Sequence, residues 1–348
     1  MDLLKRLCET PGISGYEERV QEVIREELTK VADEVKIDKL GNVIGIKKAK
    51  KIPANLSIPK KVMLAAHMDE IGFMVSSVDK DGFLHFAPVG GFDPKTLIAQ
   101  RVVVHGREDI GGVIGSKPIH ILEEEERKKV PQLRDLFIDV GLKKEEVLKM
   151  VKPGDFVTLD RNFKELNNKI ITAKALDDRV GVYVMIETLK QLKEYAVDIY
   201  AVATVQEEVG LRGATVSSFS IEPNVGIALD VTIASDIPGT KEEEVVTTLG
   251  GGTAISLMDS HTISNRKVVD FLRNIAEEYK IKYQTDVLLG GGTDAGAIQR
   301  SKSGVPVCTV SVPTRYVHSV VEMCHKEDVE NSIALMTKFL EKVHQGEF

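Results

Sequence analysis

Histidine and carboxylate residues stand at or shortly after the ends of apolar runs that predict buried β-strands in this chain. Five residues share this position: His67, Glu207, Glu208, Asp230 and His318. His67, for example, directly follows the apolar run Val62 to Ala66. Ligands of an open α/β sheet bind outside the carboxyl ends of its strands. Two histidines and several carboxylates at such ends therefore predict a hydrolytic metal site.

The adjacent acids Glu207 and Glu208 are the sharpest single signal in the sequence. Two carboxylates directly after a buried strand are costly unless something positive receives them. One carboxylate on a metal and its neighbour as general base would use both. The alternatives are a solvated exit from the strand and a paired-carboxylate glycosidase. Adjacent residues rarely lie on opposite sides of a sugar, which counts against the glycosidase.

Two further acids have a chemical interpretation and a plainer one. Asp69 lies two residues after His67, and a metal-ligating histidine usually donates its other ring N–H to a carboxylate or carbonyl. A simple polar turn is the plainer alternative. Asp177 opens a predicted helix, where acids favour the helix dipole. A carboxylate held at that point is also able to bridge two metals.

The joint occurrence of these residues favours the metal interpretation, although Asp230 and His318 would each be unremarkable alone. Carboxylates and histidines without a cysteine cluster suit a catalytic Zn or Co centre rather than a structural zinc. With Glu207 reserved as base, five ligands remain: His67, Asp177, Glu208, Asp230 and His318. One zinc needs fewer. Two metals ~3.5–4 Å apart and bridged by a carboxylate would use all five.

A glycine-rich segment at 289–296 lacks the Lys-Ser/Thr of a phosphate-binding loop and the spacing of a dinucleotide fingerprint. It is consistent with close backbone approach beside the site or with a flexible turn, and the sequence leaves both open. The other six histidines have no ligand-like context, so packing or surface roles are expected for them.

The composition excludes several classes of protein. The formal net charge is −7, which argues against a nucleic-acid partner. The apolar runs are only strand-length, so no membrane span is expected. Three scattered cysteines, Cys8, Cys308 and Cys324, have no metal-binding spacing and favour a reducing cytoplasm. A chain of 348 residues is long enough for a large domain with a smaller one.

Strands and helices alternate in two parts of the chain, which must position the candidate site. The predicted strands are 198–206, 225–231 and 306–312, and the predicted helices are 2–9, 177–193, 265–279 and 327–344. Ser14 with Glu17 predicts a capping box that opens a second helix, and Lys36 to Lys47 predicts a hairpin. The polar segment 50–61 predicts a surface loop. Short strands with glycine turns fill 71–161, which predicts an inserted β-rich domain.

The chain resembles the tetrahedral (TET) aminopeptidases, co-catalytic dinuclear metallopeptidases of clan MH. Seven motifs carry the likeness in order along nearly the whole chain: Thr10 to Glu17, Ala65 to Asp69, Ala175 to Arg179, Gln206 to Gly210, Ala228 to Thr232, Gly290 to Gly296 and Arg315 to Ser319. Seven ordered motifs make a highly specific match.

The resemblance implies a role for each site residue. Asp177 bridges two divalent metal ions, Zn or Co. His67 and Asp230 complete one metal, and Glu208 and His318 complete the other. Glu207 is the general base, and Asp69 orients His67. The resemblance also implies a cis peptide between Asp177 and Asp178.

The resemblance further implies the architecture and the activity. A mixed-sheet α/β metallopeptidase domain, residues 1–70 and 162–348, carries a small barrel-like dimerisation domain at 71–161. Six dimers form a hollow dodecamer, and the enzyme removes N-terminal residues from short peptides. Ile233, Leu288, Leu289 and Gly296 are expected near the substrate, favouring neutral aliphatic side chains. The alternatives are an endoglucanase, which the aromatic content of 5% without Trp disfavours, and a non-enzymatic shell protein.

Overall fold

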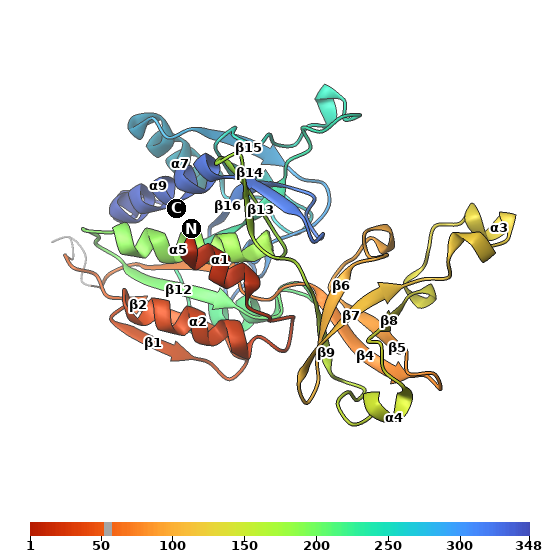
Figure 1. The fold of residues 1–348 in the computed structure, drawn as a ribbon. Coiled ribbons are helices and arrows are strands. Elements are labelled where there is room, and N and C mark those ends of the chain that lie inside the picture. Colours follow the sequence, from red (N-terminus) through yellow and green to blue (C-terminus); the bar gives the residue numbers. More distant parts are fainter. Residues whose placement is uncertain (52–57) are drawn as a thin grey trace.

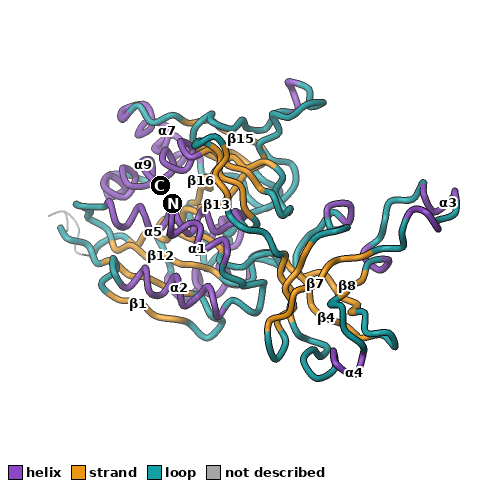
Figure 2. Tube along the Cα trace, in the orientation of Figure 1, coloured by secondary structure: helices purple, strands orange, loops and turns teal. Residues whose placement is uncertain are grey.

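The computed structural model describes residues 1–51 and 58–348, and its strands form two separate sheets (Figure 1). The larger sheet is flanked by helices, whereas the smaller sheet is a closed barrel with only short helical segments (Figure 2). The predicted class, a mixed α/β sheet with a β-rich barrel, is confirmed.

In the described part of the chain, the larger sheet contains eleven strands, nine of which lie in the order β1-β2-β12-β3-β13-β16-β17-β11-β10. The bounds are β1 Glu34–Ile37, β2 Val43–Lys47, β3 Lys61–His67, β10 Lys164–Leu166, β11 Ile170–Ala173, β12 Asp198–Thr204, β13 Val225–Ile233, β14 Thr253–Met258, β15 Tyr283–Val287, β16 Val307–Arg315 and β17 Glu322–His325. β14 pairs with β16 and β15 beside this path. The four central strands, β12, β3, β13 and β16, are mutually parallel, so their carboxyl ends share one edge.

Helices cover both faces of this sheet. Side chains along a strand alternate between the two faces, and in the central strands both sets are apolar and need to be buried. Val62 and Leu64 of β3 pack in the core under one group of helices, and Met63 and Ala65 pack in the core under another. The first group is α1 Asp2–Glu9, α2 Glu18–Thr29, α5 Leu176–Gln191, α7 Arg266–Tyr279 and α9 Lys326–Lys342. The second group is α6 Arg212–Ile221 and α8 Ala295–Gln299. Such double coverage accounts for the nearly continuous apolar sequence of the central strands.

The barrel closes in the order β4-β5-β8-β7-β6-β9 and has its own apolar core. Its elements are β4 Gly72–Val78, β5 Leu84–Val89, β6 Arg101–His105, β7 Asp109–Gly115, β8 Phe137–Asp139, β9 Phe156–Leu159, α3 Glu124–Arg127 and α4 Lys144–Val147. Short 3-10 turns complete the chain at Pro94–Thr96, Ile119–Ile121, Leu133–Asp135, Glu242–Glu244 and Val343–Gln345. An arm that carries α3 projects from the barrel on the side away from the larger sheet (Figure 1).

The predicted helices and strands are found with boundaries that differ by a few residues. The hairpin predicted at 36–47 is the antiparallel pair β1–β2. The loop predicted at 50–61 lies partly outside the described residues. The capping box was wrong: α2 begins at Glu18, and the Ser14 and Glu17 side chains bond elsewhere. Within the described residues, no helix combines the length and the apolarity that crossing a bilayer would require.

Candidate metal and active site

Four parallel strands bring most of the candidate residues to one edge of the larger sheet. His67 is the last residue of β3, and Glu207 and Glu208 follow β12 by three and four positions. His318 follows β16 in the loop that leads to β17. Asp230 differs from the prediction because it lies inside β13, which continues to Ile233. The pairing of Ala228 with Ala65 puts Asp230 level with His67 on the neighbouring strand.

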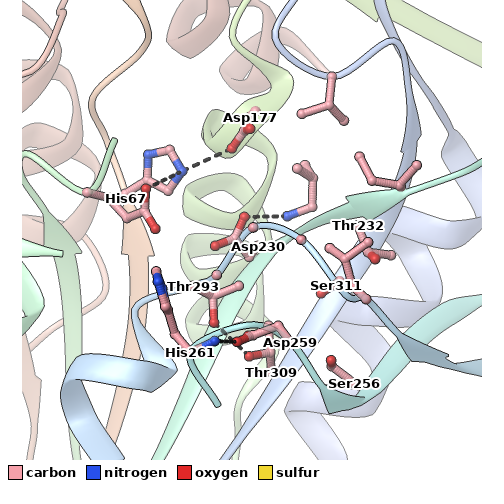
Figure 3. A pocket seen from close by; sticks show the side chains of 18 of the residues that line it. His67, Asp177, Asp230, Thr232, Ser256, Asp259, His261, Thr293, Thr309 and Ser311 are labelled. Carbon is pink, nitrogen blue, oxygen red and sulfur yellow. Dashed lines mark hydrogen bonds and ion pairs between the residues drawn. The ribbon is translucent and has the colours of Figure 1, made fainter. Parts of the chain in front are cut away.

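Asp177 enters the same place from the start of α5. The helix begins at Leu176, but Asp177 and Asp178 have non-helical φ/ψ angles. The peptide bond between them is cis, as the resemblance implied. Figure 3 shows the Asp177 carboxylate and the His67 ring facing one another, with Asp230 nearby.

Two groups of three side chains could each hold a metal ion. The groups are His67, Asp177 and Asp230, and Asp177, Glu208 and His318. In each group, one ligand atom from every residue lies within 4.8 Å of the others. Asp177 belongs to both groups: its Oδ1 is 3.0 Å from His67 Nε2 and its Oδ2 is 3.3 Å from His318 Nε2. A carboxylate with one oxygen toward each group has the arrangement of a bridging ligand.

Glu207 contributes no atom to either group but lies beside them. Its Oε2 is 4.0 Å from His67 Nε2, and its side chain is 10% exposed. Glu208 points the other way, with its Oε2 3.4 Å from His318 Nε2. The two neighbouring acids therefore have different surroundings, which is what different chemical roles require.

Asp69 contacts His67 on one side of the site and the Glu207–Glu208 segment on the other, but its carboxylate does not bond to the His67 ring as predicted. Its carboxylate Oδ1 is 3.6 Å from His67 Nδ1, which is too long for a hydrogen bond. The main-chain oxygen of Asp69 lies 3.1 Å from His67 Nδ1 and accepts a hydrogen bond from it, leaving Nε2 free to bind a metal. The carboxylate instead accepts the main-chain N–H groups of Glu207 and Glu208, at 3.0 and 3.2 Å.

The electrostatics of the site reflect several buried carboxylates close together. Burial, followed by the charges of Asp230, Asp294 and Glu208, raises the pKa of Glu207 well above its usual range. Burial also raises the pKa of Asp230. Carboxylates that repel one another in this way are stabilised in the charged form by a nearby cation.

The two histidines respond to the same charges in the opposite sense. Burial alone would lower the pKa of His67, but Glu207 and Asp177 raise it well above the usual value. The pKa of His318 rises to about 11, because Asp177 and Glu208 outweigh the effect of burial. In return, their hydrogen bonds hold the pKa of Asp177 below its ordinary value in spite of burial.

The donor set fits divalent metal ions on two counts. Imidazole nitrogens and carboxylate oxygens suit Zn or Co, and the groups contain no thiolate. Glu208 Oε1 is buried and has no hydrogen-bond partner among the described residues, so one lone-pair acceptor remains to be satisfied. The ligand residues therefore fit divalent metal ions.

A cavity of about 610 Å³ opens beside the ligands. Its described lining includes two further acids, Asp259 and Asp286, and contains neither Lys nor Arg. Ile233 and Leu288 line it as expected, but Leu289 is 84% exposed and does not, and neither does Gly296. The glycines at 290–292 and His261 also line the cavity, and Figure 3 labels His261 among the lining residues.

The glycine-rich wall permits close backbone approach, one of the two interpretations left open by the sequence. A Cβ atom built on Gly292 would lie 2.1 Å from His261 Nδ1, a distance that no side chain could keep. The main chain and the imidazole therefore pack directly against one another, and a larger residue would displace the ring.

Two acids outside the prediction form hydrogen bonds with the main chain of the ligand residues. Asp178 accepts the main-chain N–H groups of His67 and Gly181, at 3.1 and 3.0 Å. Glu322 accepts the main-chain N–H groups of Asp177 and His318, at 3.1 and 2.9 Å. The sequence showed only that Asp178 adjoins Asp177 and that Glu322 follows His318 by four residues, and neither spacing signals these contacts.

The failed capping box belongs to the same framework. Ser14 Oγ donates to Asp69 Oδ2 at 2.6 Å instead of capping α2. Glu17 Oε1 accepts the main-chain N–H groups of Gly15 and Gln206, at 2.8 and 3.1 Å. The predicted cap was wrong because these side chains tie the N-terminal segment to the loops that carry the site.

Comparison with known proteins agrees with this arrangement. Residues 41–335 match the family described as M42 glutamyl aminopeptidase. The lysyl aminopeptidase of Pyrococcus furiosus is 41% identical over 354 residues, which cover 100% of this chain and 98% of that protein.

Solved structures give the same result over the whole chain. Aminopeptidase APDkam598 from Desulfurococcus kamchatkensis has a TM-score of 0.93 at 46% identity, covering 98% of this chain and 94% of that one. The Pyrococcus horikoshii TET1 peptidase, described as assembling into a tetrahedron or a large octahedral shell, has a TM-score of 0.86 at 36% identity, with coverages of 97% and 98%. A Thermotoga maritima protein described as an endoglucanase also matches, with a TM-score of 0.80 at 32% identity and coverages of 98% and 97%. The chain therefore belongs to the M42 family of aminopeptidases, and it is an exopeptidase that hydrolyses peptides.

Proposed function

We propose that this aminopeptidase depends on two divalent metal ions and uses Glu207 as its general base. The observation that supports the proposal is the pair of three-residue groups that share Asp177. His67 and Asp230 would complete one site, and Glu208 and His318 would complete the other. The substrates would be short peptides with a free N-terminus.

The metal ions, when bound, supply Lewis-acid chemistry that acidifies water and polarises the scissile carbonyl. Glu207 accepts the proton of the attacking water and passes it to the leaving amine. Its buried surroundings, which raise the pKa of the carboxyl, favour proton uptake. The Asp69 carboxylate holds the main chain of Glu207 and Glu208 by accepting hydrogen bonds from both N–H groups.

The carboxylates around the site would also receive the positive α-amine of the substrate, which accounts for removal of N-terminal residues only.

For the first side chain we propose a preference for neutral aliphatic residues, since Val231, Ile233 and Leu288 line the cavity. The family description names glutamyl substrates, but a glutamate side chain would meet Asp259 and Asp286 and no lining Lys or Arg in the described part of the cavity. Leu-nitroanilide should therefore be cleaved far faster than Glu-nitroanilide.

We further propose that residues 71–161 form an inserted domain that joins subunits into dimers, and six dimers into a dodecamer. The barrel has its own core, as an independent domain requires. Its arm also exposes large apolar side chains, Ile119 at 62% and Ile121 at 64%, which mark an interaction surface when they are contiguous. The cytoplasm remains the proposed location, and the three cysteines are free and buried.

The proposal is tested by removing and restoring metal. The enzyme is dialysed against a chelator and then assayed on Leu-nitroanilide with no metal, with Zn²⁺ and with Co²⁺. Activity should disappear on chelation and return with either ion. Full activity in protein verified as metal-free by elemental analysis would contradict the proposed mechanism.

Cellulose in the same assay tests the endoglucanase alternative. A glycan cleft needs aromatic platforms, but the described residues that line the cavity include no Phe, Tyr or Trp. Turnover of cellulose without turnover of any aminoacyl-nitroanilide would favour the glycosidase, and a correctly assembled protein that cleaves neither would favour a non-enzymatic shell.

A further inference from the structure

Glu322 connects two segments of the site that are far apart in the sequence. It is the first residue of β17 and is 2% exposed. Its Oε2 accepts the main-chain N–H of Asp177, 145 residues away, and its Oε1 accepts that of His318. Both carboxylate oxygens are therefore engaged by residues that belong to the metal groups.

The topology of the sheet makes this double contact possible. β17 pairs with β11 so that Glu322 lies opposite Ala173, a few residues before Asp177. β17 also pairs with β16, and the connection between those two strands carries His318. Glu322 thus lies between the start of α5 and the loop after β16, which are the two segments that its carboxylate joins.

His318 needs such a contact because its backbone conformation is unfavourable. Its φ angle is +62°, in the left-handed region that residues with a Cβ rarely occupy. Conformations of this kind persist only when surrounding interactions determine them. The hydrogen bond from the His318 N–H to Glu322 is such an interaction, and the ring of the same residue lies 3.3 Å from Asp177.

We propose that Glu322 is a positioning residue that sets the geometry of the Asp177, Glu208 and His318 group by holding two of its three members through their main-chain N–H groups. The inference rests on the proposed two-metal function. Mutation of a residue that hydrogen-bonds to a metal ligand typically lowers metal affinity or activity by about 10–100-fold. Glu322 differs from the usual case because it acts on the backbone of two ligands at once.

Glu322→Gln is the informative variant. It keeps the size of the side chain but replaces one accepting oxygen with an amide that donates, so one main-chain N–H faces another donor. Binding of the metal ion held by Asp177, Glu208 and His318 should weaken by about 10–100-fold. The change is measured by equilibrium competition with a chromophoric chelator and by elemental analysis. Excess Zn²⁺ or Co²⁺ should restore most of kcat with little change in KM. Loss of a general base would not be restored in this way.

Asp328→Asn is the matched control. Asp328 is also a fully buried carboxylate that accepts two main-chain N–H groups, those of Gly250 and Gly252 at 2.7 and 2.8 Å. Neither glycine is a ligand, so this variant should lose thermal stability and keep wild-type metal affinity. If Glu322→Gln fails to fold, Glu322→Asp retains the carboxylate at a shorter reach and should show the same selective weakening.

The outcomes separate the inference from the function on which it rests. Wild-type metal affinity in a folded Glu322 variant would overturn the inference, and so would weakening equal to that in Asp328→Asn. In both cases the wild-type enzyme still binds two metals and the proposed function stands. A wild-type protein that binds no metal would instead defeat the proposed function.

Discussion

The division of labour between Glu207 and Glu208 gives the sharpest prediction. Glu207→Gln preserves shape and removes a carboxylate that belongs to neither metal group. Glu208→Gln removes a charged member of the Asp177, Glu208 and His318 group. Two neighbouring substitutions of the same chemical kind should therefore have different consequences, and each serves as the control for the other.

The magnitudes follow from the surroundings of each side chain. General acid–base catalysis contributes ~10²–10⁴-fold, so kcat of Glu207→Gln should fall by that factor, or ~2.7–5.4 kcal/mol in the barrier. Its metal content should remain at two ions per chain. Glu208→Gln leaves His67, Asp177 and Asp230 intact, so one ion should remain and the other should be lost or weakly held.

Elemental analysis after dialysis, followed by kinetics on Leu-nitroanilide, distinguishes the two variants. Excess metal should partly restore the turnover of Glu208→Gln and leave the reduced turnover of Glu207→Gln unchanged. If Glu207→Gln lost metal while Glu208→Gln retained it, the two roles would have to be exchanged. If both variants kept their metal and near-normal turnover, the catalytic reasoning would be refuted.

Two other predictions concern the barrel and its contact with helix α2. Replacing residues 71–161 with a short linker should reduce the assembly to smaller species by light scattering; elution as an intact dodecamer would rule out the assembly role. The hydrogen bond from Arg19 lowers the pKa of Asp109 to about 2, so the stability that this contact contributes is present above pH ~4 and is lost as pH falls toward 2. Both side chains are nearly half exposed, so Asp109→Asn should lower the free energy of unfolding by only ~0.2–1 kcal/mol at pH 7, seen as a small fall in Tm. A difference in Tm between variant and wild type that persists at pH 2 would contradict this assignment.

The sequence was sufficient to predict the central strands and the residues at their ends. Continuous apolar runs identify strands that are buried on both faces, and a charged residue at the end of such a run is conspicuous. His67 was found in this way, whereas Asp177 was identified at the start of a predicted helix, and the structure brings the two side chains to 3.0 Å from one another. The cis peptide after Asp177 came only from the family resemblance, because no local pattern in the sequence indicates it.

Contacts between distant segments account for most of what the sequence did not predict. Ser14 and Glu17 have the spacing of a capping box, but tertiary hydrogen bonds to Asp69 and Gln206 compete successfully for their side chains. The role of Glu322 depends on strand pairing that brings together residues 145 positions apart. A polar residue beside a motif indicates only that its side chain needs a hydrogen-bond partner. Which partner it has depends on the segments that the fold brings next to it.

The dependence of activity on the number of metal ions bound per chain tests the two-metal claim most directly. Enzyme verified as metal-free is titrated with Zn²⁺ or Co²⁺ while turnover of Leu-nitroanilide and bound metal per chain are measured on the same samples. Two sites that share Asp177 predict no activity without metal and full activity only as occupancy approaches two ions per chain. Full turnover in metal-free protein, or a maximum reached and held at one ion per chain, would contradict the two-metal account.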